Sequence, residues 1–281
     1  MKYASYTVDG RASWGAIDGD MVLDFGAAMP EYPTLVDAIG AGLSSGLDLP
    51  SGAAKLALSS VTLGLPIPNP PKILCVGRNY VDHVAEGANK ELPKHPGLFA
   101  RTVTSLTSHD GSIVRPKASD NLDFEGELAI IVGKKGRSIS REDALDYVFG
   151  YTCFNDATLR DFQERYSALV GKNFPSTGGF GPWIVTADEI PDPNADLELT
   201  TRLNGQVMQH STTGKMIFDV PTILAFISVF TLLEPGDIIL TGTPEGIGRA
   251  RNPPVWMKPG DTIEVEIERI GTLRNMIVDE P

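Results

Sequence analysis

Cysteine, basic charge and long hydrophobic runs are all scarce in this sequence of 281 residues. The only two cysteines, Cys75 and Cys153, each stand in an apolar stretch, which is typical of buried free thiols and argues against a disulfide framework or a zinc site. Acidic residues outnumber basic ones by 36 to 24, and the formal net charge is −12. Because phosphate backbones select basic surfaces, we expect no binding to nucleic acid.

No apolar stretch is long enough to suggest a membrane span. The longest, residues 220–233, contains Pro221 and covers about 14 residues, where a spanning helix needs roughly 18 or more. The N-terminal residues lack the apolar core of a secretory signal. The remaining composition, 42% hydrophobic and 21% charged, is that of an ordinary globular protein. We therefore expect a cytoplasmic protein with no membrane partner.

The sequence divides at a proline-rich segment. Residues 66–71 contain four prolines, counting Pro66, Pro68, Pro70 and Pro71, and predict an extended linker. We expect a small N-terminal α+β domain over residues 1–65 and a larger catalytic domain over residues 72–281. No residue pair in the N-terminal domain suggests chemistry, so a scaffold or interface role is expected for it.

Local signals predict several elements. Asp-Gly pairs separate three short strands between Tyr3 and Asp24, and short helices are expected at residues 34–39 and 52–58. Asn204-Gly205, between two alternating runs, predicts a tight hairpin. Residues 140–147 and 218–233 are expected to be helical. Strands are expected in a further set of segments: 72–76, 98–101, 113–115, 128–132, 148–155, 238–240, 262–267 and 273–278.

Three carboxylates stand where two of these strands begin or end. Glu125 and Glu127 open the apolar run that ends at Gly133, and alternation along a strand places them on the same side. Asp156 follows the strand at residues 148–155 and can join them. Such a buried acidic group needs a cation, a proton or basic partners, and oxygen ligands suit Mg²⁺, Mn²⁺ or Ca²⁺. The alternatives are exposed glutamates and an aspartate that only caps a helix.

A second set of residues could form a catalytic site. His83 and Glu86 are spaced so that a helix would pair them, and a carboxylate beside an imidazole raises its basicity. The loop that follows, residues 87–97, is suited to be a lid. Arg160 and Gln163 are one helical turn apart, and an arginine can bind a carboxylate through two hydrogen bonds. Surface positions for the histidine and the glutamate remain the alternative.

Two glycine-rich loops complete the set of candidates. Lys172, next to Gly171, could bring a positive charge to a reacting oxygen, and a solvated lysine is the alternative. Gly242 lets the backbone approach a ligand closely, and the neighbouring Thr243 adds a hydroxyl.

Together these segments resemble the fumarylacetoacetate hydrolase family over residues 72–278. The resemblance rests on GRNYVDHVAE, DFEGELAIIVG, YTCFNDATLRDFQ, GPWIVT, LEPGDIILTGTPEGIG and KPGDTIEVEIERIGTLRN. It implies an α+β, β-rich fold: a mixed β-sandwich or roll with a small N-terminal domain, usually in a homodimer. It also implies that Mg²⁺ or Mn²⁺, or Ca²⁺ in crystals, is held by Glu125, Glu127 and Asp156.

The resemblance also implies roles for the other candidates. The catalytic residues would be His83, Glu86, Gln163 and Lys172. The substrate would be bound by Arg78, Tyr80, Arg160, Gly242 and Thr243.

The function implied first is metal-dependent hydrolysis of a 2,4-dioxo acid, of the acylpyruvate or fumarylpyruvate type, to pyruvate and a carboxylic acid. Such an enzyme would serve aromatic catabolism, with a small 2-oxo acid as its substrate. The same metal-enolate chemistry supports alternatives: oxaloacetate decarboxylation, keto–enol or double-bond isomerisation or decarboxylation of hydroxydienoates, and sugar-acid dehydration. A non-catalytic scaffold on the same fold is the most remote alternative, and failure to bind Mg²⁺ or Mn²⁺ would favour it.

Overall fold

The fold is built on one large sheet and one smaller sheet, with few helices. The computed structural model describes residues 1–43, 47–87 and 89–281. The strands of the large sheet lie in the order β4 (Ala54–Ala57), β3 (Met21–Asp24), β2 (Arg11–Asp18), β1 (Lys2–Val8), β14 (Gly178–Thr186), β12 (Val148–Asn155), β11 (Gly126–Val132), β17 (Ile238–Leu240), β6 (Ile73–Gly77) and β7 (Gly97–Ala100). Two further strands join it, β5 (Thr62–Leu63) beside β1 and β8 (Leu106–Ser108) beside β14.

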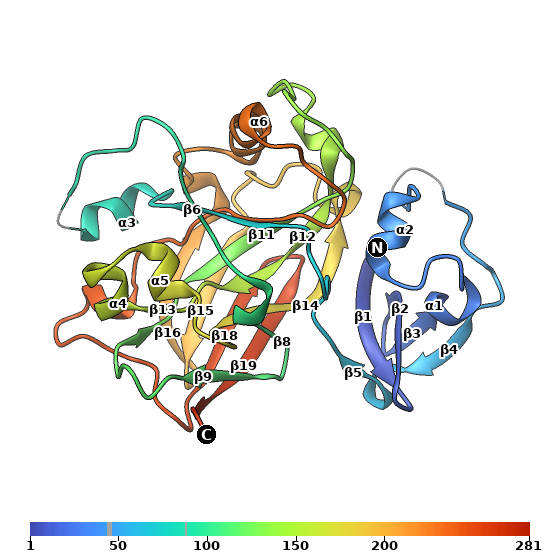
Figure 1. Ribbon diagram of the computed structural model, residues 1–281, viewed down its shortest axis with the longest axis horizontal. Coiled ribbons are helices and arrows are strands. Elements are labelled where there is room, and N and C mark those ends of the chain that lie inside the picture. The colour runs from blue at the N-terminus through green and yellow to red at the C-terminus, as the bar shows by residue number, and fades with distance from the viewer. Residues whose placement is uncertain (44–46, 88) are drawn as a thin grey trace.

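The second sheet faces the middle of the large one (Figure 1). It has five strands in the order β16 (Gln206–Thr212), β15 (Glu198–Leu203), β18 (Thr262–Ile267), β19 (Gly271–Asp279) and β9 (Ser112–Arg115). A two-stranded ladder, β10 (Leu122–Asp123) with β13 (Thr158–Leu159), lies beside it. This mixed, strand-rich architecture confirms the fold class expected from the sequence.

The helices are short. They are α1 (Phe25–Ala28), α2 (Leu35–Gly40), α3 (Val81–Glu86), α4 (Arg160–Arg165), α5 (Ala168–Lys172) and α6 (Val220–Phe230). The described part of the chain also forms 3₁₀ turns at Leu58–Ser60, Val103–Ser105, Ala144–Tyr147, Ala187–Glu189, Thr213–Lys215 and Gly248–Ala250. Among the described residues, no helix is long and apolar enough to cross a membrane.

Strand β11 is the centre of the core because both of its faces are covered. Leu128, Ile130 and Val132 pack with residues of β15, β18, β19 and α6. Ala129 and Ile131 pack on the opposite face, with a cluster that reaches into the N-terminal strands and α2. A strand that is buried on both faces reads as a continuous apolar run, as this one does.

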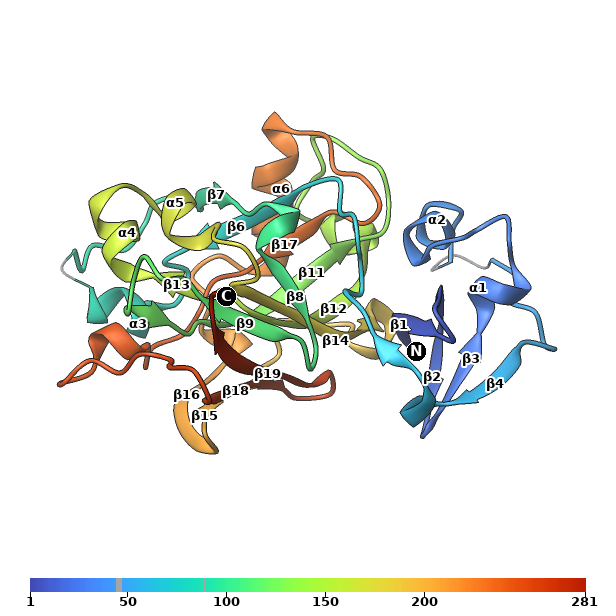
Figure 2. The same ribbon diagram turned by 60° about the horizontal axis from the view of Figure 1, so that its bottom comes forward.

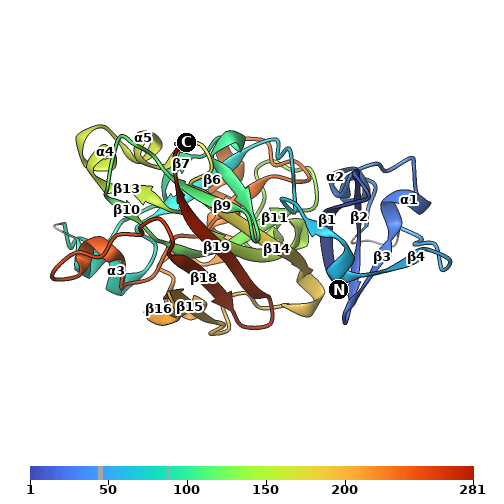
Figure 3. The same cartoon turned by 90° about the horizontal axis from the view of Figure 1, so that it is seen from below.

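The N-terminal strands are continuous with the large sheet. Residues Lys2 and Tyr3 of β1 pair with Val185 and Ile184 of β14, although the N-terminal part lies at one end of the molecule in all three views (Figures 1, 2 and 3). The proline-rich segment is packed: Ser5 Oγ donates a hydrogen bond to the Pro66 carbonyl oxygen at 2.8 Å. The division into domains therefore stays a prediction.

Most expected elements are present, but two expectations about helices fail. The helix predicted at residues 52–58 is wrong, because residues 54–57 form β4 and pair with β3. The helix predicted at residues 140–147 is reduced to a 3₁₀ turn over Ala144–Tyr147. In contrast, the hairpin at Asn204-Gly205 is confirmed, and both residues have positive φ, as a type I′ turn requires.

Candidate active site

The three predicted carboxylates meet in the interior. Glu125 directly precedes β11, Glu127 lies within it, and Asp156 follows β12. Antiparallel pairing aligns the two strand ends, and the Asp156 N–H donates to the Glu125 carbonyl oxygen at 2.7 Å. One oxygen of each side chain lies within 4.8 Å of the others, and the residues are only 5%, 2% and 0% exposed. Exposed positions are therefore excluded for both glutamates, and Asp156 does not cap α4, whose N-cap residue is Leu159.

Two of the three carboxylates have buried cationic partners. Glu125 accepts hydrogen bonds from Arg160 Nη2 at 2.6 Å and from Lys172 Nζ at 2.5 Å. Asp156 accepts from Lys172 Nζ at 2.5 Å and from Arg101 Nε. Burial alone would raise the pKa of Glu125, but Arg160 and Lys172 outweigh it and hold that pKa well below its usual range.

Glu127 differs because no Lys or Arg among the described residues forms an ion pair with it. The only hydrogen bond that its carboxylate accepts in that part of the chain comes from the N–H of Gly242, at 2.8 Å. Burial, followed by the nearby Asp156, raises the pKa of Glu127 well above its ordinary value. Three carboxylates that each offer an oxygen, one of them without a cationic partner, fit a hard divalent cation such as Mg²⁺ or Mn²⁺, whose charge would favour the ionised form of Glu127. These residues therefore suit the predicted metal.

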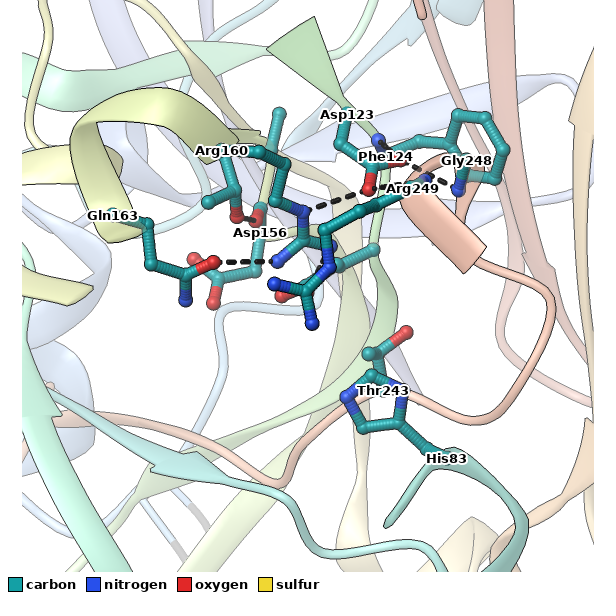
Figure 4. A network of polar contacts seen from close by, with 12 residues as sticks. His83, Asp123, Phe124, Asp156, Arg160, Gln163, Thr243, Gly248 and Arg249 are labelled. Carbon is teal, nitrogen blue, oxygen red and sulfur yellow. Dashed lines mark hydrogen bonds and ion pairs between the residues drawn. The ribbon is translucent and has the colours of Figure 1, made fainter. Parts of the chain in front are cut away.

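Arg160 is held on three sides. Its Nε donates to Asp123 Oδ2 at 2.7 Å, its Nη2 to Glu125, and its Nη1 to Gln163 Oε1 at 2.9 Å (Figure 4). The Gln163 amide nitrogen is left facing the cavity. Asp123 is fully buried and also accepts from the backbone N–H groups of Gly248 and Arg249. The predicted role of Arg160, binding a substrate carboxylate, remains untested.

The predicted pair of His83 and Glu86 is present on α3. Their side chains face each other, with His83 Nδ1 3.3 Å from Glu86 Oε2. The other oxygen of Glu86 accepts the N–H of Gly246 at 2.7 Å. The Glu86 carboxylate therefore orients the imidazole and ties α3 to the loop after β17.

The loop that follows α3 is held in place by hydrogen bonds from Arg78. Nη2 of Arg78 donates to the carbonyl oxygens of Asn89 and Glu91, at 2.7 and 2.9 Å. Tyr80 is fully buried, and no partner for its hydroxyl is found among the described residues. The substrate-binding roles predicted for Arg78 and Tyr80 stay predictions.

The loop after β17 closes another side of the site. Gly242 has φ +96°, and a Cβ there would lie 2.9 Å from the Asn79 Cβ, so no larger residue fits easily. The Thr243 hydroxyl donates to the Gly126 carbonyl oxygen at 2.9 Å and accepts from Gln209 Nε2 at 2.8 Å. Thr243 thus ties this loop to β11, while its predicted contact with substrate remains untested.

A cavity of about 390 Å³ opens over these groups. Its volume is near the lower end of the range for small-molecule sites. The predicted site residues that line it are Arg78, His83, Glu125, Glu127, Asp156, Arg160, Gln163, Lys172 and Thr243. Glu86, Tyr80 and Gly242 do not line this cavity, although Glu86 lines a smaller hollow that shares His83 with it.

The sequence reasoning missed three residues of the site. Arg101 donates a hydrogen bond to Asp156, and Asp123 accepts one from Arg160. Arg249 lines the cavity. Asp123 directly precedes the Glu125 segment and Arg249 follows a glycine-rich loop, so a signal existed for both. Nothing near Arg101 in the sequence points to Asp156, which is 55 residues away.

Comparisons with known proteins agree with this geometry. A family model described as "Fumarylacetoacetate (FAA) hydrolase C-terminal" matches residues 72–278. Oxaloacetate tautomerase YisK of Bacillus subtilis is 43% identical over 231 residues, which are 80% of this chain and 76% of that protein. The mitochondrial oxaloacetate tautomerase fahd2 of Xenopus laevis is 39% identical over 269 residues, which are 93% of this chain and 84% of that protein.

Solved structures are similar over the whole chain. A fumarylacetoacetate hydrolase from Exiguobacterium antarcticum has a TM-score of 0.88 at 39% identity, with all of both chains covered. The maleylpyruvate hydrolase of Sphingobium sp. SYK-6, in complex with manganese (II) ion and pyruvate, has a TM-score of 0.81 at 30% identity, again with both chains fully covered.

Proposed function

This chain belongs to the fumarylacetoacetate hydrolase family, and we propose that it is a divalent-metal-dependent enzyme that interconverts the keto and enol forms of oxaloacetate. The names of its relatives favour an activity on oxaloacetate over the acylpyruvate hydrolysis that the sequence suggested first, and they point to tautomerisation where the expected alternative was decarboxylation. The observation that carries the proposal is the His83–Glu86 pair beside a cavity that also contains three buried carboxylates.

Glu125, Glu127 and Asp156 would hold the ion. When bound there, Mg²⁺ or Mn²⁺ would supply Lewis-acid stabilisation of the negative charge that enolisation places on the 2-oxo group. Glu127 would offer the ion a carboxylate that forms no ion pair with the protein, because no Lys or Arg among the described residues contacts its side chain. Lys172 and Arg160 hold the other two carboxylates in position through hydrogen bonds.

The proton is moved by His83. Its Nδ1 faces Glu86, so a Nδ1–H bonded to that carboxylate leaves the opposite nitrogen, Nε2, free to accept a proton. We infer that Nε2 removes a proton from C3 of the keto form. The C–H electron pair becomes the C2=C3 bond, the carbonyl pair moves to O2, and Nε2 then returns the proton to O2. The reverse sequence yields the keto form.

The test follows both tautomers. Loss of the enol absorbance and appearance of the keto form, trapped by malate dehydrogenase and NADH, are measured with Mn²⁺ or with EDTA. We expect metal-dependent acceleration of both signals in the wild type and its loss in His83→Asn. Trapping with lactate dehydrogenase reports pyruvate, so pyruvate production without accelerated tautomer exchange would instead identify a decarboxylase.

A second candidate is hydrolysis of an acylpyruvate. A histidine oriented by a carboxylate can also activate water, and the maleylpyruvate hydrolase with a similar structure favours this reading. Metal-dependent release of pyruvate from acetylpyruvate or fumarylpyruvate, with no effect on oxaloacetate tautomers, would select it.

A further inference from the structure

The cavity has a buried acidic end and an exposed basic side. The carboxylates at its base are at most 5% exposed, whereas the Arg249 side chain on its wall is 37% exposed. A smaller hollow of about 200 Å³ adjoins the cavity and shares Arg78, His83 and Arg249 with it. There is therefore room for a substrate to extend from the carboxylates past His83 toward Arg249.

Two of the other cations of the cavity, Lys172 and Arg160, are already engaged by the protein, whereas Arg78 uses its Nη2 to hold the loop after α3. Lys172 Nζ makes three contacts, with Glu125 Oε2 and with both the side chain and the carbonyl oxygen of Asp156. Arg160 uses all three of its nitrogens on Asp123, Glu125 and Gln163. These two residues are therefore poorly placed to bind a further anion.

Arg249 retains unused donors. Its Nη1 donates to Glu164 at 2.8 Å, and that carboxylate is itself 60% exposed, so the pair is weak. Its Nε and Nη2 have no partner among the described residues. Figure 4 shows the guanidinium group reaching into the site on the side where His83 lies.

The backbone of Arg249 is fixed in place. Asp123 accepts the N–H groups of Gly248, at 2.7 Å, and of Arg249, at 3.0 Å. A Cβ at Gly248 would lie 1.9 Å from the Val255 carbonyl oxygen, so only glycine allows this close turn. The same buried aspartate positions Arg160. The backbone of Arg249 is thus fixed in position relative to Arg160 and the carboxylates at the base of the cavity.

We propose that Arg249 determines specificity by binding the second carboxylate of a dicarboxylic 2-oxo acid. The proposal rests on the proposed function in one respect: the 2-oxo acid group must lie at the carboxylate cluster. The planar guanidinium group can accept a carboxylate through two charge-assisted hydrogen bonds. Such a contact corresponds to about a 10- to 100-fold preference for the dicarboxylate.

The kinetic test compares oxaloacetate with its 4-methyl ester, which lacks the second negative charge and carries one additional methyl group. With Mn²⁺ present, we expect the wild type to have at least a tenfold higher kcat/KM for oxaloacetate. That ratio should fall toward one in Arg249→Met and be partly restored in Arg249→Lys. Equal kcat/KM values for the two substrates in the wild type would overturn the proposal and leave the tautomerase function standing.

Glu164→Gln is the matched control. If Arg249 served only to tie its loop to α4 through Glu164, this variant would reproduce the effect of Arg249→Met. We expect instead that it keeps the preference for oxaloacetate or strengthens it, because a competing anion is removed. A loss of preference equal to that of Arg249→Met would assign Arg249 a purely structural role.

A binding experiment separates this proposal from the proposed function. Malate and 2-hydroxybutyrate share a 2-hydroxy acid group, but only malate has a second carboxylate, and neither can enolise. Calorimetry on the Mn²⁺-loaded protein should show at least tenfold tighter binding of malate, with the difference lost in Arg249→Met. This result would uphold the role of Arg249 even if no tautomerase activity were found. Equal binding of the two acids by the wild type would refute it.

Discussion

The ammonium group of Lys172 contacts two oxygens of Asp156, the side-chain Oδ2 at 2.5 Å and the carbonyl oxygen at 3.0 Å. It also lies 2.5 Å from Glu125 Oε2. Burial would lower the pKa of Lys172, but Asp156 and Glu125 outweigh it and raise that pKa. Lys172 thus acts as a permanent cation within the acidic cluster.

Replacing Lys172 by Met should destabilise the metal-free protein strongly. Two buried carboxylates would lose a shared partner, and breaking such a pair costs about 3–5 kcal/mol. Denaturant unfolding in EDTA measures this, and added Mn²⁺ should recover part of the loss by supplying positive charge. Lys215→Met is the control, because Lys215 is half exposed and its ion pairs are worth at most about 1 kcal/mol. Equal losses in both variants would show that Lys172 does not stabilise the cluster.

Glu127→Gln should have the opposite effect on the metal-free protein. The amide oxygen can still accept the Gly242 N–H, and the substitution removes a carboxyl group whose charged form burial and Asp156 already disfavour. We expect unchanged or higher stability in EDTA but no stabilisation by Mn²⁺, where the wild type gains about 2.7 kcal/mol at a metal concentration 100 times Kd.

The matched variant for Glu127→Gln is Glu125→Gln. It leaves Arg160 and Lys172 short of a partner and should be less stable than the wild type in EDTA. Stabilisation of Glu127→Gln by Mn²⁺ to the wild-type extent would rule out Glu127 as a ligand.

The two oxygens of Glu86 predict different effects for two substitutions. In Glu86→Gln, the amide oxygen can keep the Gly246 contact while the NH₂ group donates to His83 Nδ1, which places the proton on Nε2 and removes the base. We expect kcat to fall about 100- to 10,000-fold with KM little changed. Glu86→Ala should lose both contacts and also raise KM. Steady-state kinetics with Mn²⁺ measures both, and a near-normal kcat in Glu86→Gln would refute the role of the pair.

Asp24 predicts acid sensitivity in the N-terminal strands. It is buried and accepts hydrogen bonds from Ser13 Oγ at 2.5 Å, Arg11 Nη2 at 2.6 Å and Tyr6 Oη at 2.9 Å. Burial would raise the pKa of Asp24, but these hydrogen bonds outweigh it and lower that pKa. The resulting stability is present above the unfolded-state pKa of about 3.9 and is lost as pH falls toward the lower folded-state value.

Asp24→Asn should therefore be less stable than the wild type at pH 7, and the gap should narrow below about pH 4. Urea unfolding at several pH values measures this gap. Asp18→Asn, at an exposed position in β2, should show little change at any pH. A gap for Asp24→Asn that stays constant with pH would contradict the assignment.

The sequence predicted what depends on neighbouring residues. The turn at Asn204-Gly205 follows from local backbone preferences. The placing of Glu125 and Glu127 on the same side of the chain follows from strand alternation. Residues 52–58 were mistaken for a helix because β4 is defined by its pairing with β3, a tertiary contact. The roles of Asp123 and Arg101 cannot be recognised from the sequence for the same reason. Each acts through an ion pair with a residue that is distant in the sequence, Arg160 for Asp123 and Asp156 for Arg101.

Both thiols are enclosed by the core. Cys75 lies in β6 and Cys153 in β12, and both are fully buried. Burial raises the pKa of Cys153 to about 12 and that of Cys75 well above its ordinary value, so the reactive thiolate form is suppressed. An alkylating reagent should therefore modify the chain only when the core opens. The rate of modification then reports global unfolding. A cysteine engineered on the surface could carry a spectroscopic label, because the two native thiols would not react in the folded protein.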